Sequence, residues 1–349
     1  MHAARPPSLA QRVQAAWSGR GALARALLPL ALVYGAAVAL RARAYRAGLL
    51  RSERVAAPVL VVGNLVAGGA GKTPATLAVV ELLRRHGWSP GIVSRGHGGT
   101  ATGVVVVGPD TPARLCGDEP LLLRRRAGVP VIVGRDRVAA ARALLRAHPA
   151  VNIVVADDGL QHLRLARDAQ LIVFDERGAG NGWLLPAGPL REPMPRSVPA
   201  RSLVLYNTAA PSTPWPGTLA RRSLAGVTAL ADWWQGATPD AGLIDRLRGR
   251  PLLAAAGVAR PGRFFALLRE AGLQIDELAL PDHHPMDPLP WPAGARDVVI
   301  TEKDAVKLPP GTALGAARVW VATLDFRLTP QGEAALLRLL PARPAPRTE

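Results

Sequence analysis

The chain has 349 residues, enough for two domains of ordinary size, and a formal net charge of +17. A single cysteine, Cys116, excludes a disulfide within the chain and a cysteine-based zinc site, and it favours a reducing compartment. The positive charge suits nucleic acid, an anionic membrane or a phosphorylated substrate. No basic run is interleaved with aromatic residues, so we expect no nucleic-acid partner, although a nucleic-acid-binding module stays as an alternative class.

Lysine is rare in this basic chain. Of the 43 basic residues only Lys72, Lys303 and Lys307 are lysine, and the others are arginine. A lysine ammonium is compact, whereas a guanidinium is a planar fork. We therefore expect these three lysines at positions where a compact ammonium is required.

An uncharged apolar run fills the chain between Arg25 and Arg41, and further arginines flank it. A helix that spans a bilayer needs about 20 apolar residues, and this run is shorter. We expect residues 1–50 to form a helical segment that associates with an anionic leaflet, either lying in the interface or crossing it. A secretory signal peptide and a buried helix of a soluble protein are the alternatives.

A valine-rich run at residues 58–63 predicts a buried parallel strand. The apolar residues of the segment 76–87 repeat with helical spacing, which predicts a helix that ends at Gly87. Between them lies a glycine-rich turn followed by Lys72 and Thr73, the order that a phosphate-binding loop (P-loop) requires. Lys72 would reach the β- and γ-phosphates of ATP, and Thr73 would offer its hydroxyl to Mg²⁺. The residues expected to bind the nucleotide are Val66, Ala67, Gly68, Gly69, Ala70, Gly71, Lys72 and Thr73.

The loop departs from the strict P-loop pattern because Val66 stands where that pattern has glycine. The pair Gly68 and Gly69 resembles a variant loop found in membrane-associated partition ATPases. Those ATPases carry a second lysine before the glycine pair, and this chain has Ala67 there. A switch ATPase of the partition type is therefore the alternative function, and a glycine-rich turn with a chance Gly-Lys-Thr is the structural alternative.

Acidic pairs follow the loop along the chain. Asp118 and Glu119 stand at the expected start of a helix, where they could be catalytic or could complement the helix dipole. Asp157 and Asp158 end a strand expected at residues 152–156, the form of a Walker B strand whose carboxylate holds Mg²⁺. The P-loop earlier in the chain favours the interpretation that Asp157 and Asp158 belong to a Walker B strand.

Eight segments in one order resemble the tetraacyldisaccharide 4'-kinases of lipid A synthesis. They are VGNLVAGGAGKTP, SRGHGG, GDEPLLLRRR, VPVIVGRDR, ADDGLQH, LLPAGPLREP, PDHHPM and TEKDAVKL. The resemblance implies an enzyme that transfers the γ-phosphate of ATP, with Mg²⁺, to the 4'-hydroxyl of a tetraacyldisaccharide 1-phosphate. It also implies work on a lipid-linked disaccharide at the cytoplasmic face of the inner membrane of a Gram-negative bacterium, with no obligate protein partner inferred.

The resemblance assigns roles to residues of the matching segments. Asp118 becomes the base for the sugar hydroxyl, with His283 as its partner. The expected catalytic residues are Asp118, His283, Asp158 and Lys72, and the expected metal ligands are Thr73, Glu119 and Asp157. The family usually has tyrosine at His97 and a different context around Asn207, so the roles of these two residues, and of Lys303, stay open.

Strands and helices continue to alternate after residue 205. The expected fold class is α/β, with a P-loop NTPase-like, mostly parallel sheet covered by helices on both faces and a second, smaller α/β domain. The expected divisions are a membrane-associating helical segment at 1–50, a P-loop kinase domain at 51–205 and a smaller domain at 206–349.

Overall fold

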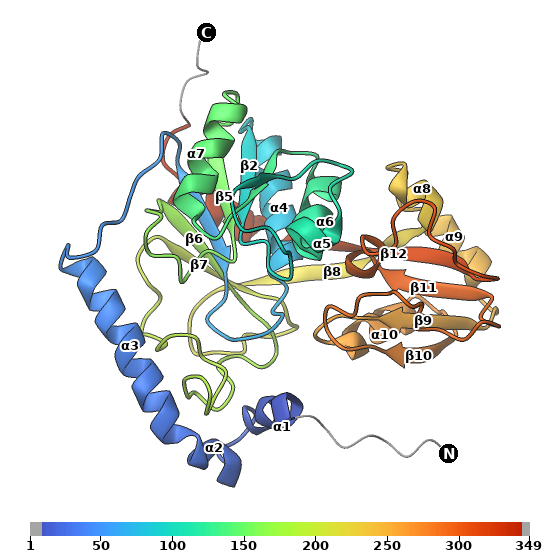
Figure 1. Ribbon diagram of the computed structural model, residues 1–349, viewed down its shortest axis with the longest axis horizontal. Coiled ribbons are helices and arrows are strands. Elements are labelled where there is room, and N and C mark those ends of the chain that lie inside the picture. The colour runs from blue at the N-terminus through green and yellow to red at the C-terminus, as the bar shows by residue number, and fades with distance from the viewer. Residues whose placement is uncertain (1–8, 344–349) are drawn as a thin grey trace. The chain divides into compact units, whose positions relative to one another are not determined.

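The computed structural model describes residues 9–343, whose contacts divide them into two compact units (Figure 1). The first unit consists of residues 9–72, Ile153–Ala220 and 328–343, and the second of Thr73–Asn152 and Arg221–Arg327. Both units are discontinuous in sequence. The domain bounds expected at 50/51 and 205/206 therefore stay a prediction.

Three helices begin the first unit: α1 (Leu9–Ala16), α2 (Ala22–Ala26) and α3 (Leu28–Arg46). The apolar run thus continues as one helix through the arginines that follow it, with Arg43 and Arg46 in the last turn, where cations complement the helix dipole. Within residues 9–343 no helix has both the length and the apolar character that a bilayer crossing demands.

Parallel strands form the sheet of the first unit: β1 (Val59–Gly63), β5 (Ile153–Asp157), β6 (Ala169–Phe174), β7 (Ser202–Tyr206) and the start of β8 (Thr218–Ala229). The order β5-β1-β6-β7-β8 follows from parallel pairings between each neighbouring pair. All residues of β1 and β5 are buried, which explains their unbroken apolar runs, since parallel strands are commonly covered on both faces. Helix α12 (Pro330–Leu339) completes this unit.

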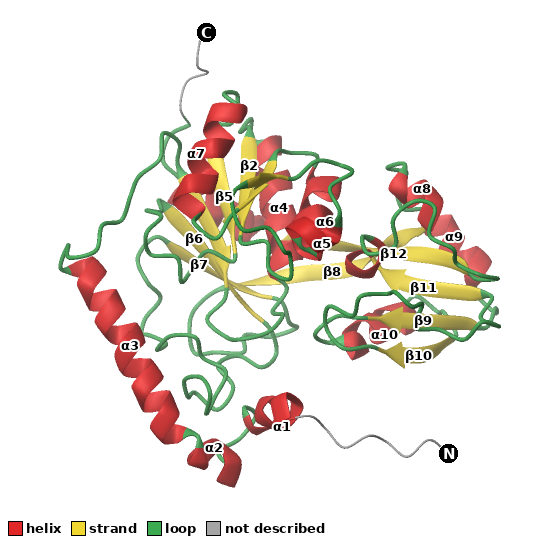
Figure 2. Cartoon of the chain, in the orientation of Figure 1, coloured by secondary structure: helices red, strands yellow, loops and turns green. Residues whose placement is uncertain are grey.

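The second unit contains two sets of strands, each with its own helices (Figure 2). In the set formed by residues 73–152, β2 (Pro90–Ser94) pairs in parallel with β4 (Val131–Val133), and β4 pairs in antiparallel fashion with β3 (Val105–Val106). The helices of this set are α4 (Lys72–Arg85), α5 (Ala113–Cys116), α6 (Asp118–Ala127) and α7 (Arg137–Ala147). Asp136 caps α7 by accepting from two backbone N–H groups.

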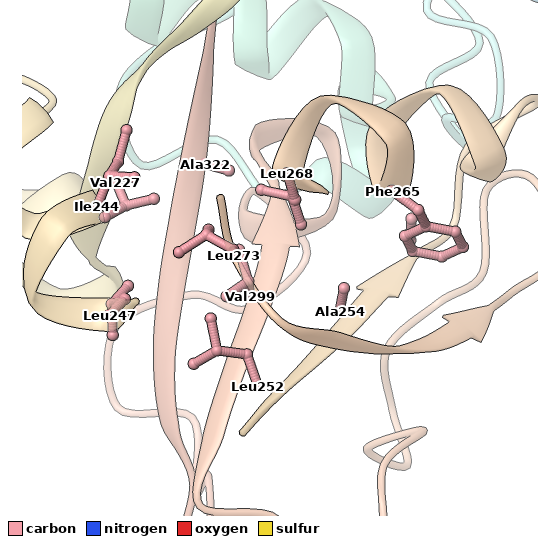
Figure 3. Packing of buried hydrophobic residues seen from close by; sticks show 11 residues of the cluster. Val227, Ile244, Leu247, Leu252, Ala254, Phe265, Leu268, Leu273, Val299 and Ala322 are labelled. Atoms are coloured by element: carbon pink, nitrogen blue, oxygen red, sulfur yellow. The ribbon is translucent and has the colours of Figure 1, made fainter. Parts of the chain in front are cut away.

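The other set has the strand order β10-β9-β11-β12, all parallel, with bounds β9 (Leu252–Ala256), β10 (Ile275–Ala279), β11 (Asp297–Thr301) and β12 (Arg318–Leu328). Its helices are α8 (Leu230–Trp234), α9 (Ala241–Leu247), α10 (Pro261–Glu270) and α11 (Glu302–Ala305). Buried side chains of α9, α10 and the strands form one apolar cluster, in which Figure 3 shows Leu268, Leu273 and Val299 close together. The expected α/β class with mostly parallel strands is confirmed, because every strand pair named above is parallel except β3–β4.

Candidate active site

The P-loop follows β1 in the first unit and leads along the chain to Lys72, the first residue of α4. Gly68 and Gly71 have φ angles of 89° and 92°, which only glycine adopts at low cost, so these two positions need glycine. Helix α4 begins at Lys72, directly after the loop, and its N-terminal N–H groups and dipole favour an anion at that end. Val66 is fully buried and forms a β-bridge with Leu190, which anchors the start of the loop.

Lys72 lies close to Asp158. The Nζ atom is 3.8 Å from Asp158 Oδ1, and the lysine side chain is only 10% exposed. Arg191 Nη1 donates to the same carboxylate at 2.9 Å. Asp158 has φ 48°, a left-handed conformation that is uncommon for residues other than glycine and that clusters at functional sites. The structure therefore brings together two of the four expected catalytic residues, Lys72 and Asp158.

Asp157 ends strand β5 and is almost fully buried. Its register partner on the neighbouring strand β1 is Val62, which directly precedes the last residue of that strand. The carboxyl ends of parallel strands meet at one edge of a sheet, so Asp157 lies at the edge from which the P-loop departs. Among residues 9–343 no three His, Cys, Asp or Glu side chains gather into a group that could hold a metal ion.

The donors that are present nevertheless suit Mg²⁺. This ion takes oxygen ligands, and in nucleotide sites it binds one or two carboxylates and the substrate's phosphates rather than a cage made of protein alone. Thr73 supplies a hydroxyl in the first turn of α4, and Asp157 supplies a carboxylate. A carboxylate and a hydroxyl are the donor types expected when phosphates complete the coordination.

Asp118 and His283 lie together in the second unit, although 165 residues separate them in sequence. His283 Nδ1 is 2.9 Å from Asp118 Oδ2 and 3.1 Å from Oδ1. Asp118 is the first residue of α6, and its side chain is 6% exposed, whereas the His283 side chain is 32% exposed. His283 has φ 60°, so it also adopts a left-handed backbone conformation. The predicted pairing of a carboxylate with an imidazole is present.

Asp118 and His283 each shift the pKa of the other. Burial alone raises the pKa of Asp118, but the hydrogen bond from His283 and the charge of Lys303 outweigh it, so the pKa lies below its usual value. The hydrogen bond to Asp118 raises the pKa of His283, while burial and the charge of Lys303 oppose that rise. Asp118 is consequently a carboxylate at neutral pH, and the protonation state of His283 decides whether it faces an imidazole or an imidazolium.

Lys303 contacts His283 at Nε2, the ring nitrogen that does not face Asp118. Its Nζ atom is 3.0 Å from Glu119 Oε1, 3.1 Å from Asp282 Oδ1 and 3.2 Å from His283 Nε2. Burial lowers the pKa of Lys303, but Glu119, Asp118 and Asp282 raise it by a larger amount, so the side chain is an ammonium. Because an ammonium has only donors, Nε2 of His283 accepts from it and the ring proton lies on Nδ1, facing Asp118.

Glu119, which was expected to bind metal, is therefore paired with a lysine here. It could serve a metal only by exchanging that partner. His97, whose role stayed open, places its ring edge-on to His283 with 5.6 Å between the ring centroids.

All three lysines have carboxylate partners, and all three are largely buried. Lys72 faces Asp158, and Lys303 faces Glu119 and Asp282. Lys307 pairs with the fully buried Asp304 at 2.7 Å and donates to the carbonyl of His284, the residue after His283. Each lysine side chain is at most 15% exposed.

Sequence reasoning missed three residues of these sites. Arg191 stands inside the quoted segment LLPAGPLREP, and a lone arginine in a Gly/Pro-rich loop was the available signal. Asp282 precedes His283 in PDHHPM, and its carboxylate had no role until Lys303 was placed beside it. Arg177 lies in the loop after β6 and contacts the P-loop, and no local pattern singles it out.

Comparison with known proteins agrees with these features. The family model described as "Tetraacyldisaccharide-1-P 4'-kinase" matches residues 23–341. A curated relative from Methylibium petroleiphilum named tetraacyldisaccharide 4'-kinase is 61% identical over 329 residues, covering 92% of this chain and 90% of the relative. A relative of the same name from Leptothrix cholodnii is 58% identical over 343 residues, covering 96% and 97%.

A solved structure gives the same fold. It is the crystal structure of an "apo" form of LpxK from Aquifex aeolicus in complex with ATP, with a TM-score of 0.74 and 24% sequence identity. The match covers 91% of this chain and 99% of that one. The resemblance carried by the eight segments is confirmed over nearly the whole length, and the chain belongs to the tetraacyldisaccharide-1-P 4'-kinase family.

Proposed function

We propose that this chain transfers the γ-phosphate of ATP to the 4'-hydroxyl of a tetraacyldisaccharide 1-phosphate, the lipid A precursor. The observation that carries the proposal is family membership over residues 23–341. Its curated relatives are named for a 4'-kinase of a tetraacyldisaccharide. The lysine-ended P-loop and the buried Asp118–His283 pair are the parts that such a reaction requires.

Asp118 acts as the base in the proposed reaction. A sugar hydroxyl is a poor nucleophile until its proton is accepted. Asp118 takes that proton, the hydroxyl oxygen bonds to the γ-phosphorus, and the bond from this phosphorus to the β,γ-bridging oxygen breaks to release ADP. His283 supports the carboxylate through Nδ1, and Lys303 holds the ring from the Nε2 side.

The P-loop binds the triphosphate through its backbone N–H groups and Lys72. Asp158 lies near the ammonium of Lys72, and Arg191 neutralises that carboxylate, so Lys72 stays available to the β- and γ-phosphates. Thr73 and Asp157 would hold Mg²⁺, with Glu119 as a third candidate, and the ion would neutralise negative charge on the transferring phosphate.

The N-terminal helix places the enzyme at the membrane in this proposal. Leu30, Leu32, Val33 and Leu40 of α3 are 60%, 71%, 71% and 70% exposed, an unusual number of large apolar side chains in contact with solvent on one helix. An apolar pocket beside α3 is lined by residues that include Leu28, Leu32, Trp183, Leu184 and Trp215. We infer that α3 lies in an anionic leaflet, on the cytoplasmic face of the inner membrane, and that acyl chains of the substrate use this apolar surface.

The direct test is to incubate the purified protein with Mg-ATP and a tetraacyldisaccharide 1-phosphate in detergent or lipid. The product should carry a new phosphate on the 4' position, detected by mass spectrometry and ³¹P NMR. Absence of that product with the unmodified enzyme would refute the function. ATP hydrolysis coupled to dimerisation, without any lipid product, would favour the partition-type ATPase instead.

Single substitutions distinguish the proposed base, Asp118, from the proposed phosphate-binding residue, Lys72. Asp118→Asn should keep ATP binding and lower kcat by about 10²–10⁴-fold, the usual contribution of a general base. Lys72→Ala should lower kcat/KM by roughly 10²–10³-fold, because a preorganised positive group at the phosphates is removed. Arg54→Met is the matched control, since the Arg54 side chain is 73% exposed and forms an ion pair with Asp168, which has no role in the proposed reaction. Full rate in Asp118→Asn would exclude Asp118 as the base.

A further inference from the structure

Four consecutive carbonyl groups of the P-loop accept hydrogen bonds from side chains. Arg177 Nη1 donates to Ala67 O at 3.2 Å, and Arg177 Nη2 donates to Gly69 O at 3.1 Å. Asn64 Nδ2 donates to Gly68 O at 3.3 Å, and Asn207 Nδ2 donates to Ala70 O at 3.1 Å. Every backbone oxygen from residue 67 to residue 70 is thus held by one of three side chains, which we call the carbonyl clamp: Asn64, Arg177 and Asn207.

The three clamp residues come from neighbouring strands. Asn64 directly follows β1, Asn207 directly follows β7, and Arg177 lies in the loop after β6. Strand β6 lies between β1 and β7, and all three are parallel. Their carboxyl ends therefore meet at one edge of the sheet, and the clamp holds the loop against that edge.

The guanidinium of Arg177 is itself fixed. Asp175, which is fully buried, accepts from Arg177 Nε at 2.9 Å, and its Oδ2 atom forms an ion pair with Arg177 Nη2 at 2.9 Å. Hydrogen bonds from a charged donor are roughly twice as strong as those between neutral groups, and a planar fork keeps its geometry. Arg177 can thus bridge two carbonyl groups that lie two residues apart.

The two left-handed glycines of the loop fit against the clamp. A Cβ on Gly71 would lie 2.2 Å from Asn207 Nδ2, and a Cβ on Gly68 would lie 3.1 Å from Arg177 Nη1. Both glycines also have positive φ angles. A side chain at Gly71 would displace Asn207, so the glycine and its clamp residue are needed together.

The clamp leaves the amide groups of the loop available. Within residues 9–343 the N–H groups of residues 68–71 have no protein acceptor, whereas Ala67 N donates to Pro189 O. Because side chains hold the carbonyl groups of the loop, its N–H groups remain available to an anion, as in the successive backbone N–H groups that bind phosphate in other P-loops. A loop that already has this shape loses less conformational entropy when the phosphates bind.

We propose that Arg177 and Asn207, together with Asn64, are positioning residues that shape the P-loop before ATP binds. The inference rests on the proposed kinase function only in taking ATP as the ligand. Arg177 and Asn207 act through the loop, and neither needs to touch the phosphates. Their removal raises the dissociation constant for Mg-ATP while the transfer step, which belongs to Asp118, continues at a similar maximal rate.

The test measures Mg-ATP binding by isothermal titration calorimetry in the absence of lipid, and then steady-state rates with lipid present. Arg177→Met should raise the Kd and the KM for ATP by about tenfold or more, as expected when preorganising hydrogen bonds are lost. The value of kcat should stay within about threefold, since the transition-state contacts remain. Arg177→Lys should be intermediate, because an ammonium keeps the charge but cannot bridge two carbonyl groups.

Asn207→Leu supplies a second, uncharged test, because it deletes one donor and keeps the size of the side chain. It should raise the Kd for ATP less than Arg177→Met does. In the nucleotide-free protein, both variants should show faster hydrogen exchange at residues 68–71. Arg54→Met is again the matched control and should bind ATP as the unmodified protein does.

Unchanged ATP affinity in both variants overturns the inference, as does a loss of kcat with normal ATP affinity. If Arg177→Met unfolds, Asn207→Leu alone decides. Calorimetry without lipid separates the two proposals: an unmodified enzyme that binds ATP without phosphorylating the lipid refutes the kinase function and leaves the clamp intact.

Discussion

In the proposed mechanism, the protonation of His283 determines how activity falls at acidic pH, the acid limb of the pH profile. Asp118 can accept a proton readily only while His283 is neutral, because an imidazolium would hold the carboxylate in an ion pair. The hydrogen bond to Asp118 raises the pKa of His283 above its ordinary value of 6.5. The rate kcat/KM should therefore fall as the pH drops through a midpoint above 6.5, and a pH profile of lipid phosphorylation measures it.

The raised pKa of His283 affects stability and activity in opposite directions as the pH changes. A raised pKa in the folded protein means that the His283 contribution to stability is complete below pH 6.5 and is lost as the pH rises through the raised value. The pair thus contributes least to stability where the enzyme is most active. A rate that does not change across this range in the unmodified enzyme would contradict the assignment of His283.

Lys303 sets the position of that limb. Its charge lowers the pKa of both His283 and Asp118. In Lys303→Met the pKa of His283 should rise further, so the acid limb should move to higher pH, and kcat should fall because the ring loses its partner at Nε2. Lys303→Arg keeps the charge, so its acid limb should stay near that of the unmodified enzyme, even though a guanidinium does not reproduce all three contacts of the ammonium. An acid limb in Lys303→Met at the same pH as in the unmodified enzyme would show that Lys303 acts only by packing.

Helix α6 carries Asp118 at its first residue and is tied down near its other end. The Arg125 guanidinium carbon is 4.0 Å from the Trp234 ring centre and 4.9 Å from that of Trp233. Arg125 also donates to the carbonyl groups of both tryptophans, and Arg126 pairs with Glu302, the residue before Lys303. The two ends of α6 are therefore connected to the segments that bear Lys303 and the paired tryptophans.

Arg125→Met should destabilise the protein and disturb this connection. A partly buried cation–π contact is worth about 1–2 kcal/mol, so the free energy of unfolding in urea should fall by roughly that amount. Helix α6 should also exchange its amide hydrogens faster, and the rate of lipid phosphorylation should fall while ATP binding is kept. Equal stability of Arg125→Met and the unmodified protein would mean that the stacking contributes nothing.

Elements with a clear pattern were predictable from the sequence, and elements without one were not. The buried runs that became β1 and β5 and the helix that became α4 stand near their expected positions. Strand β8 was not expected, because Arg221 and Arg222 interrupt its apolar pattern and its first residues are only partly buried. Charged residues at half-exposed positions carry no strand signal that can be read without the tertiary structure.

The candidate site, too, could be predicted from the sequence only where its residues are contiguous in the chain. The P-loop could be read locally, because its glycines, Lys72 and the flanking elements are contiguous. The pairing of Asp118 with His283 came from family resemblance, since no pattern in the chain connects residues so far apart. The roles of Asn207 and Lys303 became visible only through contacts with Ala70 and Glu119, which depend on how the strands and loops fold together.

The charge of the whole protein and the apolar residues of α3 should act together at a membrane. A net charge of +17 attracts the protein to an anionic leaflet, and the exposed Leu30, Leu32, Val33 and Leu40 supply apolar contacts once it arrives. The double substitution Leu32→Glu with Val33→Glu should release the protein from vesicles that contain anionic lipid. Sedimentation with such vesicles measures the bound fraction.

The same variant separates membrane binding from catalysis. Phosphorylation of a lipid presented in vesicles should fall, while ATP binding should be unchanged, because α3 does not contribute to the P-loop. Raising the salt concentration should weaken binding of the unmodified protein through charge screening. The part of the binding that survives at high salt is the part that the apolar contacts of α3 supply. A double variant that still sediments fully with the vesicles would show that α3 is not the membrane contact, and arginines elsewhere would have to provide it.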